Sequence, residues 1–467
     1  MLKLYNTLSQ KKEILKPRQG KRINLFVCGP TTYDFSHLGH ARTYLVFDMI
    51  VKYLRQKGYN VFYLQNITDI DDKIINRAEE RKTTPQKLAR FFEKEYLKDM
   101  KSLKIDSVTK YAGATKHIKE IVSQVERLLK KGFAYQIKDG IYYDIAKFKE
   151  YGKLSKRTIR QAEDGVSRID ESKRKKNKGD FCLWKLSKSE EPRWNSPFGW
   201  GRPGWHIEDT AIAEKFFGPQ YDIHGGAKDL IFPHHEAEIS QMEAISGKKP
   251  FVRYWLHSGF LTVKGQKMAK SLGNFITIRD FLKKNENRIL RLLVIKTHYR
   301  SPLDYNEKML CQNKKELERI DEFIEKIKNP RLRQGFGGQA KLKIPKGEFK
   351  MAMDDDFNTP KAIAVIFNLI TKVNTLISQN QLSLANAKKI LLFLEKVDKV
   401  FNFIFQEKTK TCLPAGREKI KLLNLVKQRE KYRKEGLWQK ADEIRKRIKE
   451  MGYWIEDTKE GSKIKKI

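Results

Sequence analysis

The chain has 467 residues, of which 40% are hydrophobic and 11% aromatic, enough for several folded modules and too much for a largely disordered chain. Its 96 lysines and arginines outnumber the 57 aspartates and glutamates and leave a net charge of +39, which favours a polyanionic partner. No CxxC spacing occurs among Cys28, Cys182, Cys311 and Cys412, which excludes a disulfide framework and fits a reducing compartment.

The sequence predicts no membrane segment. The N-terminal stretch MLKLYNTLSQKKEILKPRQG lacks the apolar core of a signal peptide, and the longest apolar runs, such as AIAVIFNLI, are too short to cross a bilayer. We therefore expect a cytoplasmic protein.

The first recognisable unit is a strand, a helix and a second strand. The run INLFVCG after Arg22 is typical of a buried strand, and a turn then leads to Ser36, in N-cap position before a helical pattern from His37 to Lys57. Gly58 ends that helix, and the aromatic and branched run YNVFYLQNI predicts the next strand. Such a unit implies a parallel sheet and a nucleotide-binding architecture.

The middle of the chain interrupts this sheet. Residues from about 75 to 130 combine helical apolar spacing with many charges, and IDESKRKKNKGD is a basic loop. Both features indicate an insertion. Strand and turn signals return at YDIHGGAKDLIFPHHE, between two helical patterns, so the sheet is expected to resume there.

From about Tyr305 onward the pattern is helical. Lysine-rich amphipathic segments such as KKELERIDEFIEKIK predict a helix bundle, and the strings RLRQGFGGQAK and TCLPAGREK predict surface loops. The chain ends in a basic helix, a glycine, a second basic helix and a short aromatic tail.

The expected fold is therefore α/β: a Rossmann-type parallel sheet with an insertion, followed by an all-α helix bundle and a small C-terminal domain. The expected segments are 1–115 and 200–260 for the two halves of the Rossmann domain, 116–199 for the insertion, 261–304 for a region with a glycine-bearing loop, 305–410 for the bundle and 418–467 for the small domain.

A first candidate site is His37-Leu38-Gly39-His40, between the first strand and its helix. A helix N-terminus presents free amides and the positive end of the dipole, so phosphates bind there. The two imidazoles share one helix face, and Gly39 lets a ligand approach the backbone. An isolated HxxH pair is more often a helix cap, but in a nucleotide-binding architecture it predicts donors to a phosphate.

A second candidate site is Lys267-Met268-Ala269-Lys270-Ser271, in a glycine-bearing loop. Mobile lysines on such a loop can close over a triphosphate and neutralise the charge that builds on the departing pyrophosphate. In a chain so rich in lysine the alternative is a solvated basic turn. The pairing with the first site favours the nucleotide.

These two segments resemble the HIGH and KMSKS signatures of class I aminoacyl-tRNA synthetases, and the flanking blocks are similar to those of the cysteinyl branch. The blocks follow the family order from about residue 1 to 462: CGPTTYDFSHLGHART, NITDIDDKIINRA, GRPGWHIE, DIHGGAKDLIFPHHEAEISQ, KGQKMAKSLGNF, HYRSPLDY, MDDDFNTPKA and EDTKEGS. Ala269 stands where the KMSKS signature has its first serine, and Ala227 replaces the third glycine of an HGGG block.

The resemblance implies a role for each matching position. It implies catalytic roles for His37, His40, Lys267 and Lys270. It implies ATP contacts for Gly39, His224, Gly225, Gly226, Lys270 and Ser271. It implies that Thr68 and Trp205 lie beside the amino-acid substrate.

The resemblance also implies a zinc ion that receives the substrate thiol, with ligands at Cys28, Asp209, His234 and Glu238. Asp209 departs from the family pattern WHIECS, although a carboxylate can also bind zinc. The i, i+4 spacing of His234 and Glu238 places two ligands on one helix face, whereas His235 and Glu236 are expected to point elsewhere. Taken one by one, these residues could also be a buried thiol, a surface carboxylate and a helix pair.

The implied reaction activates L-cysteine with ATP and Mg²⁺ to cysteinyl-adenylate and transfers the acyl group to the terminal ribose of tRNA(Cys), on a monomeric enzyme. A zinc-bound thiolate would distinguish cysteine from serine without editing. The helix bundle and the basic terminal segment would hold the tRNA phosphates, the latter through Arg429, Lys431, Arg433, Arg445, Lys446 and Arg447. Trp438 and Trp454 would stack on bases or simply pack.

Two other hypotheses stay open. A cysteine ligase that uses a small amine acceptor would share the catalytic half, although MDDDFNTPKA and the basic terminus argue against it. An inactive RNA-binding paralogue would explain the departures at Asp209, Ala227 and Ala269. The intact histidines and lysines of the two candidate sites argue against that reading.

Overall fold

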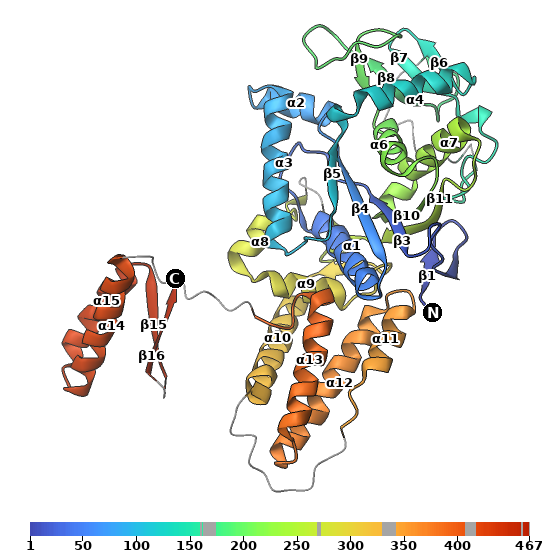
Figure 1. Ribbon diagram of the computed structural model, residues 1–467. Helices are drawn as coiled ribbons and strands as arrows, with labels where there is room; N and C mark the ends of the chain where they lie inside the picture. Colours follow the sequence, from blue (N-terminus) through green and yellow to red (C-terminus); the bar gives the residue numbers. More distant parts are fainter. Residues whose placement is uncertain are drawn as a thin grey trace. The chain divides into compact units, whose positions relative to one another are not determined.

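The structure is a computed structural model that describes residues 1–158, 161, 174–268, 272–328, 342–406, 417–458 and 461–466. It divides into two compact units, Met1–Ile404 and Phe405–Ile467 (Figure 1). The predicted loop at 331–341 lies outside the described residues, as do residues 411–416 of the predicted loop TCLPAGREK, which include Cys412. The last three residues of that string are instead the start of a helix that begins at Arg417.

A five-stranded parallel sheet lies at the centre of the first unit, in the order β11-β10-β3-β4-β5, and confirms the predicted architecture. Its strands are β3 (Arg22–Val27), β4 (Asn60–Ile67), β5 (Lys110–Gly113), β10 (Tyr221–Ala227) and β11 (Val252–Ser258). The chain proceeds outward from β3 to β5 and later outward from β10 to β11, so the strand order reverses between β3 and β10. Ligands of such sheets bind in the crevice at the carboxyl ends of the strands beside this reversal.

Helices pack on the sheet and on each other. They are α1 (Leu38–Gln56), α2 (Asp72–Glu80), α3 (Pro85–Ser102), α4 (Ile118–Lys130), α6 (Ile207–Phe217) and α7 (His234–Ser246). Helix α1 packs against β4, β10 and β11, whereas α6 packs against β4, α4 and α7. Gly58, with φ of +87°, follows the end of α1 as predicted.

The N-cap of α1 is His37, one residue later than the predicted Ser36. The His37 imidazole accepts a hydrogen bond from Gly39 N, as a capping side chain does. Ser36 is buried, and its carbonyl accepts from the backbone N–H of Ile278. The serine therefore belongs to a backbone connection with a later segment.

The insertion is a four-stranded antiparallel sheet in the order β6-β7-β8-β9. Its strands are β6 (Ala134–Ile137), β7 (Gly140–Tyr143), β8 (Phe181–Leu186) and β9 (Gly201–Pro203). Tyr143 and Trp184 of this sheet share one hydrophobic core cluster with Phe26, Leu64 and Trp255 of the parallel sheet. The insertion is thus packed as part of the first unit. Its predicted basic loop lies partly outside the described residues.

Two small sheets and a group of helices complete the first unit. The sheets comprise β1 (Lys3–Asn6) with β2 (Lys11–Ile14), and β12 (Leu261–Val263) with β13 (Gln266–Lys267) and β14 (Leu303–Tyr305). The helices are α8 (Ile278–Lys284), α9 (Asn287–Ile295), α10 (Glu307–Lys328), α11 (Lys346–Asp354), α12 (Thr359–Ser378) and α13 (Leu384–Phe401). Among the described helices, α12 alone is long and apolar enough to cross a membrane by length and composition. It is longer than the apolar run considered above, and it packs against α10 and α11 in the bundle.

Successive carboxylates of the MDDDF segment attach the bundle to the sheet domain. Asp354 accepts a hydrogen bond from Tyr53 Oη at 2.7 Å and lies 2.5 Å from Lys57 Nζ, at the end of α1. Asp355 forms an ion pair with Lys12 of β2 at 2.6 Å. Asp354 and Asp355, which are adjacent in the sequence, therefore contact two different elements, α1 and β2.

Asp356 makes the most buried of these contacts. One of its carboxylate oxygens accepts from the backbone N–H of Tyr5 at 2.7 Å and from Tyr299 Oη at 2.8 Å, and the other accepts from Arg300 Nε at 2.8 Å. Its φ is +59°, which aspartate tolerates better than most residues. The Tyr299 carbonyl in turn accepts from Gly259 N at 2.7 Å, just after β11.

The second unit comprises α14 (Arg417–Lys434), α15 (Trp438–Glu450) and the hairpin of β15 (Tyr453–Thr458) and β16 (Gly461–Lys466). The predicted aromatic tail is this hairpin. Arg429 is buried and forms two parallel hydrogen bonds with Asp457, at 2.7 and 2.8 Å. The prediction that Arg429 binds tRNA phosphates is therefore wrong, because its guanidinium holds the hairpin onto α14.

The adjacent carboxylates of Asp355 and Asp356 allow a matched test of the contact between the helix bundle and the sheet domain. Asp356→Asn should lower the free energy of unfolding by about 2–3 kcal/mol, because it leaves buried donors without a charged acceptor. Asp355→Asn should cost less than about 1 kcal/mol, because its ion pair is exposed. Urea unfolding followed by tryptophan fluorescence compares the two variants. An equal loss of unfolding free energy in the two variants would show that the burial of Asp356 adds nothing to stability.

Candidate active site

A cavity of about 380 Å³ opens at the carboxyl ends of the strands, beside the reversal of strand order. That volume suits a nucleotide or a small substrate. Most of the predicted site residues that the structure describes line it. They are Cys28, His37, Gly39, His40, Thr68, Trp205, Asp209, His234 and Lys267.

The HLGH segment forms one wall of this cavity. The rings of His37 and His40 stack with their centroids 3.9 Å apart, which confirms that they share one face. Burial, and then the neighbouring His37, lower the pKa of His40 well below its usual value. His40 is therefore neutral at pH 7 and can donate a ring N–H to a ligand without carrying a charge.

The HLGH segment is joined through the backbone to the residues that follow the second signature. Leu38 N donates to the Ile276 carbonyl at 3.1 Å, and Ile278 N donates to the Ser36 carbonyl at 2.9 Å. Lys267 at the end of β13 lines the cavity from this side. Ala269, Lys270 and Ser271 lie outside the described residues, so the ATP contacts of Lys270 and Ser271 stay predictions.

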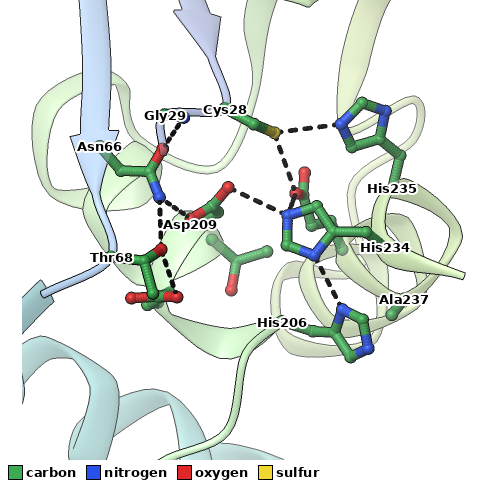
Figure 2. A network of polar contacts seen from close by, with 12 residues as sticks. Cys28, Gly29, Asn66, Thr68, His206, Asp209, His234, His235 and Ala237 are labelled. Atoms are coloured by element: carbon green, nitrogen blue, oxygen red, sulfur yellow. Dashed lines mark hydrogen bonds and ion pairs between the residues drawn. The ribbon is translucent and has the colours of Figure 1, made fainter. Parts of the chain in front are cut away.

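A buried polar cluster, drawn in Figure 2, contributes Cys28, Asp209 and His234 to the lining of the cavity. Cys28 directly follows β3, and its Sγ lies 3.9 Å from Glu238 Oε1 of α7. His234 Nε2 lies 3.1 Å from Asp209 Oδ2 and 3.0 Å from Glu238 Oε1. The four predicted metal ligands are therefore brought together.

Two further histidines lie against Cys28, and one of them corrects a prediction. His235 Nε2 is 3.1 Å from Cys28 Sγ, so His235 does not point elsewhere. The Cys28 thiol lies beside the first turn of α7, within reach of both His234 and His235. Glu236 does point away, because its carboxylate accepts from the backbone N–H groups of Leu154 and Ser155. A neighbouring pair of histidines at a helix start was the only sequence signal for this contact.

The HGGA block lies partly on the cavity and partly behind it. Ala227 is a lining residue, whereas the His224 ring lies 3.3 Å from Cys28 Sγ and stacks on Trp255. A Cβ on Gly225 would lie 2.3 Å from the Phe47 ring of α1, so that glycine permits the close packing of α1 on β10. The predicted ATP contacts of His224, Gly225 and Gly226 are not shown by this arrangement.

Burial and neighbouring charges shift the pKa values of three members of the cluster. Burial, and then the carboxylates of Asp209 and Glu238, raise the pKa of the Cys28 thiol well above its usual value. Burial raises the pKa of Glu238 to about 7. Burial alone would lower the pKa of His234, but Glu238 and Asp209 raise it to about 10. A divalent cation could take the place of these protons.

The donor set fits a zinc ion. Cys28, Asp209, His234 and Glu238 are all buried, and their ligand atoms lie within 4.8 Å of one another. One sulfur, one imidazole nitrogen and two carboxylate oxygens are donors that zinc accepts. Glu238 Oε2 receives no hydrogen bond, although His224 Nδ1 lies 3.3 Å away. A second group replaces Asp209 and His234 with His224 and His235, but the first group is the one that faces the cavity.

Trp205 and Thr68 lie beside this donor set. The Trp205 ring stacks on His234 with centroids 4.5 Å apart. The Thr68 hydroxyl donates to Glu208 Oε1 at 2.8 Å. Both side chains line the cavity, next to the place where the cluster opens into it.

A family model and named relatives match this chain. Residues 14–315 match the model of the class I (C) tRNA synthetase catalytic domain, and residues 348–406 match the DALR domain. The cysteine–tRNA ligase of Methanococcus maripaludis is 44% identical over the full length of both chains. That of Thermococcus gammatolerans is 42% identical and covers 100% of this chain and 99% of its own length.

Solved structures with low sequence identity share the fold. Methionyl-tRNA synthetase of Mycobacterium tuberculosis, bound by methionyl-adenylate, has a TM-score of 0.61 at 14% identity and covers 82% of this chain and 92% of its own. The family model and the full-length relatives both span the two signature segments. The chain belongs to the cysteine–tRNA ligase family of class I aminoacyl-tRNA synthetases.

Proposed function

We propose that this chain activates L-cysteine with ATP and transfers the cysteinyl group to tRNA(Cys). One observation carries the proposal: a single cavity is lined both by the HLGH histidines with Lys267 and by Cys28, Asp209 and His234. The first group suits a nucleotide, and the second suits a thiol-bearing substrate. In this proposal the enzyme acts as a monomer in the cytoplasm, and Mg²⁺ accompanies ATP.

In the first step, a carboxylate oxygen of cysteine attacks the α-phosphorus of ATP. The bond to the bridging oxygen breaks, and pyrophosphate leaves with the electron pair. His37 and His40 would donate to phosphate oxygens at the N-terminus of α1, where the helix dipole also favours negative charge. Lys267 and Lys270 would neutralise the leaving pyrophosphate.

In the second step, a hydroxyl of the terminal ribose of tRNA attacks the carbonyl of the adenylate and displaces AMP. The protein contributes chiefly by holding both reactants in position. The Trp205 ring would close one side of the cysteine pocket, and Thr68, whose hydroxyl is held by Glu208, would lie against the substrate.

The thiol end of the pocket would be completed by a metal ion. A zinc ion held by Cys28, Asp209, His234 and Glu238 would supply a Lewis acid that favours the thiolate of cysteine, a soft donor that the serine hydroxyl cannot match. The carboxylate of Asp209 makes this donor set harder than one with a second thiolate.

The second unit supports a role in tRNA binding. The exposed side chain of Trp454 lies under the guanidinium group of Arg445, which is 4.5 Å from the ring. The exposed Trp438 ring lies 5.9 Å from Arg433, whose guanidinium already forms an ion pair with Asp457 at 2.6 Å. An aromatic ring beside a cation can stack on a base while the cation pairs with a phosphate.

Amino-acid-dependent exchange between ATP and pyrophosphate tests the activation step. Zinc-supplied protein should catalyse the exchange with cysteine and not with serine, because only the thiol offers a soft donor. Exchange with serine would show that the pocket has another substrate. Exchange with neither amino acid would favour the inactive paralogue.

Two single variants should separate the nucleotide side from the amino-acid side. His40→Ala should lower kcat for the exchange by about 10²–10³-fold with little change in KM for cysteine, because it removes a donor to the transition state. Trp205→Ala should instead raise KM for cysteine at least about tenfold, since a buried aromatic contact is worth roughly 1.5–3 kcal/mol. If both variants changed the same parameter, the division of the cavity would be wrong.

A variant of the second unit tests the tRNA contact. The double change Arg445→Ala with Trp454→Ala should raise KM for tRNA at least about tenfold, since one stacked base is worth about 1–3 kcal/mol. The exchange reaction, which needs no tRNA, should keep its rate. Lys449→Ala, on the same helix, serves as a control for the loss of one positive charge. A loss of tRNA charging no greater than that of the control would exclude this surface.

A further inference from the structure

Asp209 is held by a neighbouring side chain that lies outside the donor set. Asn66, at the carboxyl end of β4, donates from its side-chain amide to Asp209 Oδ1, and this contact is short. The other Asp209 oxygen, Oδ2, faces His234 Nε2 at 3.1 Å. The two oxygens of the carboxylate therefore have different partners, one on the sheet and one in the donor set (Figure 2).

The orientation of the Asn66 amide follows from the backbone. Its carbonyl oxygen accepts a hydrogen bond from Gly29 N at 2.5 Å. Because a backbone N–H can only donate, this contact assigns the oxygen to Gly29 and leaves the NH₂ group for Asp209. Asn66 is 2% exposed and lies at the wall of the cavity.

The same side chain connects two of the ligand-bearing segments. Gly29 directly follows Cys28, and a Cβ at position 29 would lie 1.7 Å from the backbone carbonyl oxygen of Asn66. The end of β3 and the end of β4 are thus in close backbone contact. Through its amide, Asn66 fixes the position of Asp209 on α6 relative to Cys28.

We propose that Asn66 is a positioning residue that holds Asp209 Oδ1 and so presents the single oxygen Oδ2 to the metal. A carboxylate can offer two oxygens to one ion, whereas a thiolate can offer only one donor atom. By occupying one oxygen, the Asn66 amide makes the carboxylate behave as a single donor and keeps the set at four. This inference rests on the metal site of the proposed function.

The test compares metal binding by full-length variants, with zinc affinity and Co²⁺ absorption as readouts. Asn66→Ala removes the hydrogen bonds to Gly29 N and Asp209 and a longer one to Thr68 Oγ1 at 3.4 Å, and Asn66→Asp keeps an acceptor for Gly29 N but loses the donor to Asp209. Asn6→Ala is the matched control, because Asn6 is also buried and also bonds backbone groups, those of Arg253 and Trp255 in β11, but contacts none of the four donors directly. Both changes at Asn66 should weaken zinc binding about 10–100-fold, and the control should not.

Co²⁺ reports the coordination number. Wild-type protein should show a thiolate charge-transfer band from Cys28 together with the strong visible absorption of a four-coordinate ion. In Asn66→Ala the charge-transfer band should persist while the visible absorption weakens, because the released oxygen adds a donor. Asp209→Cys removes the second oxygen, so in that background Asn66→Ala should change zinc affinity less than about threefold.

Each result has one meaning. If wild-type protein binds neither metal, the metal site fails and this inference fails with it. If wild-type protein binds metal and the changes at Asn66 match the Asn6→Ala control, the metal site stands and the role of Asn66 is overturned. If Asn66→Ala weakens binding equally in the Asp209→Cys background, Asn66 acts on the cluster in general and not through the carboxylate, which also overturns the proposal.

Discussion

The hydrogen bond from Cys28 N to the Gly225 carbonyl, at 3.1 Å, joins β3 to β10 where the strand order reverses, and the rest of the site depends on it. It sets the thiol at the base of the crevice. Because Gly225 has no side chain, Phe47 of α1 packs directly on the same strand. The start of α1, with its two histidines, therefore lies within reach of the thiol end, and one small cavity can serve both ends of an aminoacyl-adenylate.

The cost of this arrangement is a concentration of buried acids. Asp209, Glu208 and Glu238 are each at most 2% exposed, and burial raises the pKa of both glutamates. Buried carboxylates are tolerated where each has a donor or a cation. Thr68 supplies a donor to Glu208, and His234 supplies one to Glu238. A divalent ion would complete the compensation, and a carboxylate at position 209 makes its presence more important for charge balance than a neutral side chain would.

Sequence patterns predicted the parts of this molecule that depend on local chemistry. The strand, helix and strand around the HLGH segment, and the i, i+4 pair on α7, follow from periodicity and spacing. The resemblance to a family supplied the ligand set, since no local rule connects Cys28 with Asp209. Side chains that matter through distant contacts escaped prediction: Asn66 follows an ordinary buried strand, His235 was excluded by helix geometry alone, and Arg429 looked like one more exposed cation in a basic helix. Their roles depend on which segments the fold brings together.

The three adjacent carboxylates of the MDDDF segment have a consequence for the modularity of the molecule. Each one is matched to a different part of the sheet domain: Asp354 to α1, Asp355 to β2, and Asp356 to β1 and the turn at Tyr299. A helical bundle taken from a relative could not be grafted onto this catalytic core by joining the chains alone. The graft would also need the partner side chains in three separate segments, so recombination between relatives should succeed only where the bundle and those segments are inherited together.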